Sequence, residues 1–295
     1  MKNKYKINLI LFFNNQRGYN SFLYLKKKKF FNIKKIFLSR KFLNLSIYKK
    51  LKKYSPSVIK NPNTKKMKNF IKNNKVDFSL ICGFPYIFKD KIINEPKYCT
   101  LNLHAGKLPK YRGGSPLNWQ IINGEKKIGL SVVKINSKID QGPIVTETKF
   151  TLKKNYDIAK VHFISNNLFP KLLYRSIKKI LTNPKKNFSK QVKKNSKYYK
   201  QRTDKDGKIN WKSNSINIFN LVRATTKPYP CAYAFDSKRR KIKIIKSHLF
   251  RVKNDKSFFP GKVSIIKKKI FVDCLDGKLQ VLKSSRKLVE GEILR

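Results

Sequence analysis

The chain has 295 residues, of which 40% are hydrophobic and 13% aromatic. This composition excludes a wholly disordered chain, and the length predicts one large domain or two ordinary ones. The formal net charge is +56, yet only 11 of the 71 basic residues are arginine, whose planar fork suits phosphate best. Lys, Asn, Ile, Phe and Tyr, all encoded by AT-rich codons, are abundant throughout. The charge therefore has two explanations, codon bias and a nucleic-acid surface, of which we favour the first.

The cysteines and the apolar runs restrict the class of protein further. The four cysteines are widely spaced and form no CxxC pair, which argues against a zinc site or a redox dithiol (Cys82, Cys99, Cys231 and Cys274). They are expected to be buried thiols in a reducing compartment. The apolar runs 7–13 and 78–88 are shorter than the ~18 apolar residues of a membrane span. The basic, apolar N-terminus lacks a small-residue cleavage site, so we predict a cytoplasmic protein with no membrane partner.

Short apolar runs bounded by turn residues predict buried strands in the first part of the chain, at 7–13, 33–38, 78–82, 99–103, 128–135 and 144–150. Helices are predicted between them, at 23–31, 115–122 and 158–181. Pro116 would open the second helix after a Ser115 cap, and the third has apolar residues every three or four positions. Alternating strands and helices predict a Rossmann-like α/β domain at 1–182, with a mostly parallel sheet and helices on both faces.

The composition then changes along the chain. Residues 183–203 are polar, basic and poor in aliphatic side chains, which is typical of a linker. A short helix is predicted at 215–224. Short strands follow, with turns at Pro260-Gly261 and Asp276-Gly277, and they lie at 232–235, 242–247, 262–266, 270–274 and 279–282. This pattern predicts a second domain at 204–295, a small β-barrel of the oligonucleotide-binding (OB-like) type.

Residues 101–145 carry the most informative pattern, LNLHAGKLPKYRGGSPLNWQIINGEKKIGLSVVKINSKIDQGPIV. Asn102 and His104 are two positions apart on a strand, so their side chains point to the same face. A glycine-rich loop follows directly, and ligands of open α/β sheets bind at the carboxyl ends of strands. Taken alone, the histidine is compatible with a structural role, and Asp140 with the cap of a turn.

These elements together resemble the signature of the 10-formyltetrahydrofolate-dependent formyltransferases. The matching elements are Asn102, His104, Leu108-Pro109, Tyr111-Arg112-Gly113 and Asp140-Gln141-Gly142. One position departs from the family, which commonly has a serine where this chain has Gly106. The resemblance extends from about residue 76 to the C-terminus, while residues 1–75 match only in general pattern.

The resemblance implies that a primary amine attacks the formyl carbon carried on N10 of the folate. Asn102 and a protonated His104 would donate hydrogen bonds to the oxyanion that develops. Asp140 would orient the imidazole, favour its protonated form and relay the proton of the amine through a water. This chemistry requires no metal, and the sequence offers no cluster of metal ligands.

The resemblance also implies a folate pocket between two segments. Phe84, Tyr86 and Ile87 lie in the stretch GFPYIF, and Asn136 and Ile139 in the loop before Asp140. Ordinary core packing is the alternative for each of them. We expect a cleft at the ends of the strands at 78–82 and 99–103, with these two segments as its walls. A loop beside it is expected to border the acceptor; its residues are Gly106, Leu108, Pro109, Arg112 and Gly113.

The amine acceptor has two candidates. The stretches PLNWQIINGEKKIG and VRATTKPYPCAYAF are closer to amino-sugar nucleotide formyltransferases, which we favour. Methionyl-tRNA formyltransferases usually carry Ala-Ala-Pro-Ile-Gln where this chain has Gly-Ser-Pro-Leu-Asn-Trp. The basic composition favours initiator Met-tRNA instead. A further alternative is a non-catalytic RNA-binding protein with the same fold, because fold alone does not prove activity.

Overall fold

The computed structural model describes residues 6–184, 188–192, 194–250 and 258–295. Their contacts divide the chain into two compact units, each described by itself below. The first contains Met1–Gly113, Gly129–Phe150 and Phe163–Tyr198. The second contains Gly114–Ile128, Thr151–His162 and Tyr199–Arg295. Most of the predicted linker thus belongs to the first unit by its contacts.

The first unit is built on a sheet with the strand order β3-β2-β1-β4-β5-β7-β8. Pairs β1–β2, β2–β3, β1–β4 and β4–β5 are parallel, and β7 is antiparallel to β5. The prediction of a mostly parallel sheet is therefore confirmed. The strands are β1 (Ile7–Phe12), β2 (Phe31–Ser39), β3 (Ser57–Ile59), β4 (Phe78–Ile81), β5 (Cys99–His104), β7 (Lys127–Lys134) and β8 (Ile144–Thr151).

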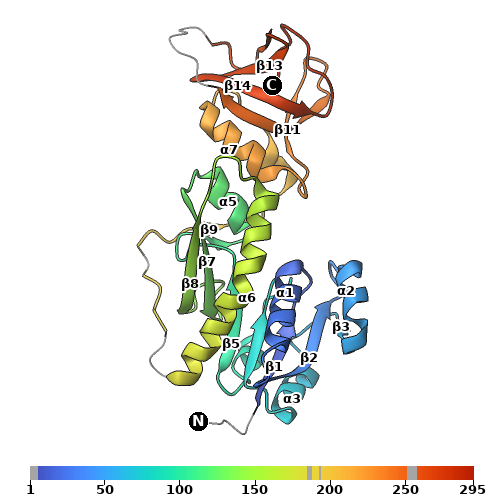
Figure 1. The fold of residues 1–295 in the computed structure, drawn as a ribbon, viewed down its shortest axis with the longest axis vertical. Helices are drawn as coiled ribbons and strands as arrows, with labels where there is room; N and C mark the ends of the chain where they lie inside the picture. The colour runs from blue at the N-terminus through green and yellow to red at the C-terminus, as the bar shows by residue number, and fades with distance from the viewer. Residues whose placement is uncertain (1–5, 185–187, 193, 251–257) are drawn as a thin grey trace. The chain divides into compact units, whose positions relative to one another are not determined.

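Helices cover both faces of this sheet because the direction of strand addition reverses at β1 and crossovers are right-handed. On one face, side chains of α3 and α4 join Ile10, Phe12 and Phe37 in one core cluster. On the other, α1 and α6 run alongside each other, where Asn20 Nδ2 donates to the Asn166 carbonyl (Figure 1). The helices are α1 (Gln16–Lys26), α2 (Leu45–Leu51), α3 (Lys65–Asn73), α4 (Asp90–Ile93) and α6 (Ile158–Thr182), with a 3₁₀ turn at Lys52–Tyr54.

The first predicted helix was placed wrongly. It was expected at 23–31, but α1 begins at Gln16, because Asn15 is its N-cap and accepts from the Gly18 N–H. The polar run at its start was interpreted as a turn, although capping residues and an exposed first turn have the same composition.

The second predicted helix is confirmed, but the predicted cap at its start is not. α5 (Pro116–Ile122) has proline at its first position, as predicted. The Ser115 cap is wrong: Ser115 is left-handed (φ 50°) and its side chain makes no capping bond. Its Oγ accepts from the backbone N–H of Arg202 instead, at 3.2 Å. Two further short strands, β6 (Arg112–Gly113) and β9 (Tyr198–Tyr199), pair with each other.

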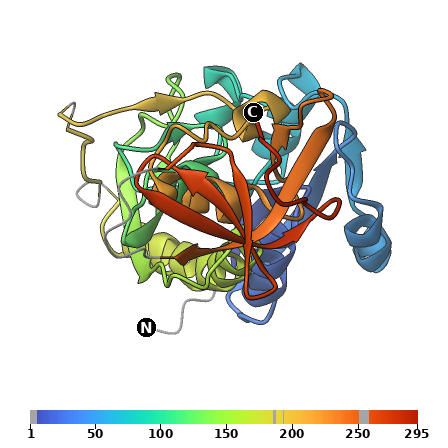
Figure 2. The same ribbon diagram turned by 90° about the horizontal axis from the view of Figure 1, so that it is seen from above.

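The second unit contains a five-stranded sheet of order β10-β11-β14-β13-β12, antiparallel throughout. The C-terminal tail links its two edges, because Phe235 of β10 exchanges two backbone hydrogen bonds with Arg295 and Val263 of β12 donates to Glu292. The predicted small barrel thus takes the form of a sheet whose edges the tail connects (Figure 2). Its elements are η2 (Asp204–Gly207), α7 (Ser215–Thr225), β10 (Ala232–Phe235), β11 (Lys241–Phe250), β12 (Val263–Ile266), β13 (Lys269–Cys274) and β14 (Gly277–Ser284).

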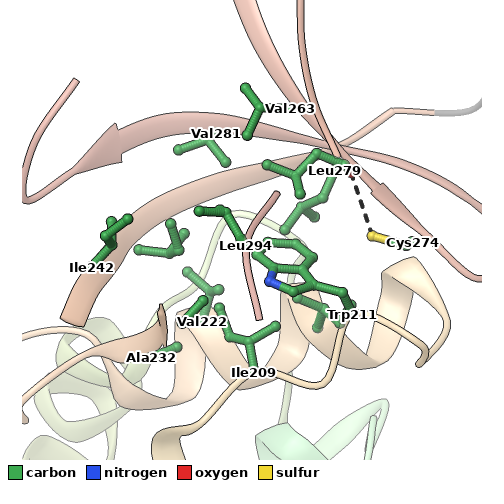
Figure 3. Close-up of a cluster of buried hydrophobic side chains, with 14 of the residues drawn as sticks. Ile209, Trp211, Val222, Ala232, Ile242, Val263, Cys274, Leu279, Val281 and Leu294 are labelled. Atoms are coloured by element: carbon green, nitrogen blue, oxygen red, sulfur yellow. Dashed lines mark hydrogen bonds between the residues drawn. The ribbon is translucent and has the colours of Figure 1, made fainter. Parts of the chain in front are cut away.

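Apolar side chains of α7 and of the five-stranded sheet form one buried cluster in the second unit. Trp211 lies within it, only 3% exposed, beside Val222 of α7 and Leu279 of β14 (Figure 3). Burial on this scale stabilises the unit by about 25 cal/mol for each Å² of apolar surface removed from water. Among the described helices of both units, none is long and apolar enough to cross a membrane.

Candidate active site

The site is built at the carboxyl end of β5, in the first unit. This strand lies between β4 and β7, so its backbone is paired on both sides and its side chains are held in place. Asn102 and His104 lie on one face of it, opposite Val133 and Ser131 of β7. His104 is buried, at 5% exposure, and Asn102 is half-buried.

Asp140 joins these two residues from the turn after β7. Its Oδ2 lies 3.4 Å from His104 Nδ1, and Asn102 Nδ2 donates to its Oδ1 at 3.5 Å. The Gly113 N–H also donates to Oδ2, at 2.9 Å. Asp140 itself has a left-handed backbone (φ 51°), a conformation that costs a non-glycine residue of order 1–3 kcal/mol and is typical of functional sites. The fold thus brings the three predicted catalytic residues together.

The environment keeps Asp140 ionised. Burial alone would raise the pKa of this carboxyl group, but hydrogen bonding and charge attraction from His104 oppose it. The Gly113 N–H and the charge of Arg112 act in the same direction, and the net result is a pKa below the ordinary value of 3.8. A carboxylate in this state can hold a protonated imidazole at Nδ1.

The other ring nitrogen of His104 has a partner that the sequence did not indicate. Nε2 lies 2.5 Å from the backbone carbonyl oxygen of Tyr111, a buried residue in the loop after β5. Gly106 permits this approach: a Cβ there would lie 2.6 Å from His104 Nε2 and 2.7 Å from the Tyr111 oxygen. The departure from the family signature at position 106 therefore shapes the surroundings of the histidine.

The two segments expected to form the folate pocket lie at one end of the sheet. Phe84 is buried against Phe12, and Tyr86 packs on the same cluster. Ile135, the residue before Asn136, packs on this cluster too. Ile87 and Ile139 are 67% and 42% exposed, although both are large apolar side chains. Asn136 is exposed and its side chain accepts from the Lys138 N–H, which shapes the loop.

The loop expected to border the acceptor is fixed by its own backbone. The Gly106 carbonyl accepts from Ser131 Oγ at 2.9 Å, and Leu108 is buried. The Pro109 carbonyl accepts from the Lys197 N–H at 3.4 Å. The last two predicted residues, Arg112 and Gly113, form β6. The Arg112 side chain donates to Gln191, and the Gly113 N–H donates to the Asp140 carboxylate.

Three residues that support the site were missed by sequence reasoning. Arg17 Nη1 donates to the carbonyl of Leu103 at 3.1 Å, within β5 itself. Asn63 Nδ2 donates to the Ile87 carbonyl at 2.8 Å, and so fixes one wall of the predicted pocket. Gln191 binds both Arg112 and the turn of Asp140. Each lies in a polar stretch without a recognisable motif, so sequence patterns did not indicate its role.

The second unit has a cavity of about 110 Å³ among its described residues. Its lining includes Ser115, Arg202 and Tyr229, and none of the predicted site residues. Arg202 is partly buried, and its Nε has no hydrogen-bond partner among the described residues. This burial lowers the pKa of Arg202, an effect that nearby acidic groups partly oppose. A desolvated guanidinium of this kind can bind an anion.

Two family models match the chain. One is described as formyl transferase and matches residues 25–174; the other, its C-terminal domain, matches residues 202–291. The methionyl-tRNA formyltransferase of Thermodesulfovibrio yellowstonii is 33% identical over 228 residues, which are 75% of this chain and 70% of that protein. The bifunctional polymyxin resistance protein ArnA of Wigglesworthia glossinidia brevipalpis is 36% identical over 210 residues, 68% of this chain but only 31% of that protein.

Solved structures show the same fold. WlaRD, a sugar 3N-formyl transferase, superposes with a TM-score of 0.70 at 21% identity, covering 96% of this chain and 100% of its own. The N-formyltransferase of Helicobacter canadensis, solved with folinic acid and dTDP-3-aminofucose, gives 0.70 at 22% identity, covering 94% and 98%.

Substitution of Gly106 by alanine is expected to destabilise the first unit. The new Cβ would overlap the Tyr111 carbonyl, which is backbone and cannot rotate away, so we expect a loss of about 1–3 kcal/mol in the free energy of unfolding. Urea titration measures this, with Lys107→Ala, an exposed neighbour, as the control. Equal stability of Gly106→Ala and the control would show that the loop does not pack on His104 in this way.

Asp140→Asn is expected to change how stability depends on pH. Because the pKa of Asp140 is lowered in the folded state, its carboxylate stabilises the protein above the ordinary value of 3.8. That contribution is lost as the pH falls through the lower, folded-state value. The difference in unfolding midpoint between wild type and variant should therefore be largest near neutral pH and shrink below pH 4. A constant difference, like that of the exposed control Glu147→Gln, would contradict the lowered pKa.

Proposed function

This chain belongs to the formyltransferase family, and from that premise we propose that it moves the formyl group of 10-formyltetrahydrofolate to the primary amine of an amino-sugar nucleotide. It is a formyl-transferring enzyme. The observation that carries the proposal is the convergence of Asn102, His104 and Asp140 at the carboxyl end of β5. The folate, as cosubstrate, would supply the formyl carbon that the amine attacks. We propose a cytoplasmic location for this reaction.

Asn102 is proposed as the neutral donor to the developing oxyanion. Its Nδ2 is held only at the outer limit of a hydrogen bond, 3.5 Å from Asp140 Oδ1, so the amide N–H can turn to a substrate oxygen at little cost. A donor placed in advance stabilises charge that develops only in the transition state.

His104 and Asp140 are proposed to act as a pair. The Asp140 carboxylate accepts from His104 Nδ1, which fixes the orientation of the ring. Nε2 then carries the proton that a substrate oxygen would accept. In the free protein this proton faces the Tyr111 carbonyl, so donation requires the loop to share or release that bond when substrates are bound. Asp140 can also take the proton of the attacking amine through a water.

The folate pocket is proposed between the segments 84–87 and 136–139. Ile87 and Ile139 each expose apolar surface, and Ile135, just before the second segment, packs on the cluster that contains Phe84. An aromatic pteridine placed between them would remove this surface from water, which is favourable.

The amino-sugar nucleotide is favoured by local sequence and by the proteins whose solved structures share this fold. This chain covers nearly the whole length of WlaRD and of the Helicobacter canadensis N-formyltransferase. The second of these was solved with folinic acid and dTDP-3-aminofucose. The alternative acceptor is initiator Met-tRNA, which the net charge of +56 and the methionyl-tRNA formyltransferase relatives favour.

The acceptors can be distinguished by turnover and salt. We expect release of tetrahydrofolate and N-formylation with dTDP- or UDP-linked amino sugars, with a rate that changes little between 50 and 200 mM salt, because such acceptors carry two phosphates. Binding of a tRNA that contacts many phosphates would weaken by about 10³-fold or more over that range. Formylation of initiator Met-tRNA with a steep salt dependence, and none of the sugars, would overturn the proposed acceptor. Asn102→Ala serves as the inactive control.

Asn102→Ala is expected to lower kcat by roughly 10²–10³-fold while changing KM much less, because it removes one donor to the oxyanion. Asn32→Ala is a matched control, since Asn32 lies near the opposite, amino end of the parallel strand β2. Initial rates of tetrahydrofolate release, measured over a range of substrate concentrations, give kcat and KM. Equal activity of the two variants would remove Asn102 from the mechanism.

A further inference from the structure

The side-chain amide of Gln191 forms hydrogen bonds with two parts of the site. Its Oε1 accepts from Arg112 Nε at 3.1 Å and from Arg112 Nη2 at 2.9 Å. Its Nε2 donates to the carbonyl of Asp140 at 2.9 Å and to the carbonyl of Gly142 at 2.6 Å. All four hydrogen bonds that this amide readily makes are thus formed. One side chain joins β6 to the turn that carries Asp140.

The segment around Gln191 is itself anchored. On its N-terminal side, Ser189 and Ile144 exchange two backbone hydrogen bonds of 2.9 Å, which extends β8 by one bridge. On its C-terminal side, the Lys197 carbonyl accepts from the Arg112 N–H at 3.0 Å. Gln191 is half-buried between these two attachments. Residues predicted as a polar linker therefore hold a fixed side chain over the site.

Gln191 contacts the turn in which Asp140 has its strained backbone conformation. Asp140 has a left-handed backbone, which persists only when its surroundings fix it. Gln191 binds its main-chain carbonyl, and the Gly113 N–H binds its carboxylate. The turn also packs against β7, since a Cβ at Gly142 would lie 1.8 Å from the Lys134 carbonyl oxygen. Gln191 further orients the Arg112 guanidinium, whose charge helps to keep Asp140 ionised.

We propose that Gln191 is a positioning residue of this enzyme, which sets the conformation of the Asp140 turn and directs the charge of Arg112 toward the Asp140 carboxylate. The proposal rests on the proposed function for its effect on catalysis. Its structural part stands on the four hydrogen bonds alone. Gln191 touches neither the acceptor nor the formyl group in this assignment, and acts only through Asp140 and Arg112.

Two substitutions separate its contacts. Gln191→Ala removes all four. Gln191→Glu keeps an acceptor for Arg112 but turns an oxygen toward the carbonyls of Asp140 and Gly142, where a donor is required. The neighbour Lys190 is exposed, and Lys190→Ala is the matched control in the same segment. Circular dichroism and the unfolding midpoint verify that each variant is folded.

The kinetic test is the pH profile of formyl transfer. Gln191→Ala should lower kcat by about 10–100-fold, the usual range for removal of an outer-shell partner, with KM for the folate little changed. Because Arg112 is no longer directed at Asp140, the pKa of Asp140 should return toward its ordinary value, and the acid limb of the profile should move to higher pH. A purely structural role would not move this limb. Activity and acid limb equal to those of Lys190→Ala would overturn the proposal.

A second measurement does not depend on turnover. If wild type transferred no formyl group to any acceptor, the proposed function would fail, but the coupling of Gln191 to Asp140 would still be measurable from stability. The effects of Gln191→Ala and Asp140→Asn on the unfolding midpoint should be less than additive at neutral pH, and additive below the folded-state pKa of Asp140. Strict additivity at neutral pH would overturn the positioning role by itself.

Discussion

The carboxylate of Asp140 is the interaction on which the site depends. It is buried, so it must be paired, and it is paired three times: with the His104 imidazole, the Gly113 N–H and the Asn102 amide. These partners come from β5 and β6, whereas Asp140 follows β7. Because β7 is antiparallel to β5, its last residue, Lys134, pairs with Leu101 near the start of β5. The turn that follows then brings Asp140 back to Asn102 and His104, so the course of this turn sets the distance between acid and imidazole.

Much of the fold could be predicted because the spacing of apolar residues along the chain indicates which side chains are buried. The strands at 78–82 and 99–103 are short segments rich in apolar residues, and both are central strands of the sheet. The catalytic candidates were predictable because Asn102 and His104 share a strand face and Asp140 belongs to the same family signature. Polar residues carry no such period. The start of α1 at Gln16 and the partner of Ser115 depend on hydrogen bonds that alternative local structures could equally satisfy.

The supporting residues could not be predicted for a related reason. Gln191 lies in a segment whose composition is that of a linker, and its role arises only because Ser189 is bridged to β8. The Tyr111 carbonyl reaches His104 only because position 106 has no side chain. The family signature marks this position as a departure, but the consequence, an acceptor on Nε2, requires the course of the backbone. Contacts between main-chain atoms and distant side chains leave no trace in sequence patterns.

The distribution of acidic residues bears on the net charge of +56. The chain has only 15 acidic residues, and some of them are buried and hydrogen-bonded. Asp77 accepts from the Asn8 N–H at 2.8 Å, and Asp273 pairs with Lys278 while accepting from the Phe259 N–H. Replacing either would leave buried donors unpaired, at a cost of about 1–3 kcal/mol each. Exposed acids have no such cost, so drift toward lysine codons would remove them first. Among the described acids only Asp77, Asp236 and Asp273 are buried, so burial accounts for part of those that remain. Lysine spread over the whole chain is what codon bias predicts. A surface selected for one polyanion would instead concentrate its basic residues, with more arginine among them.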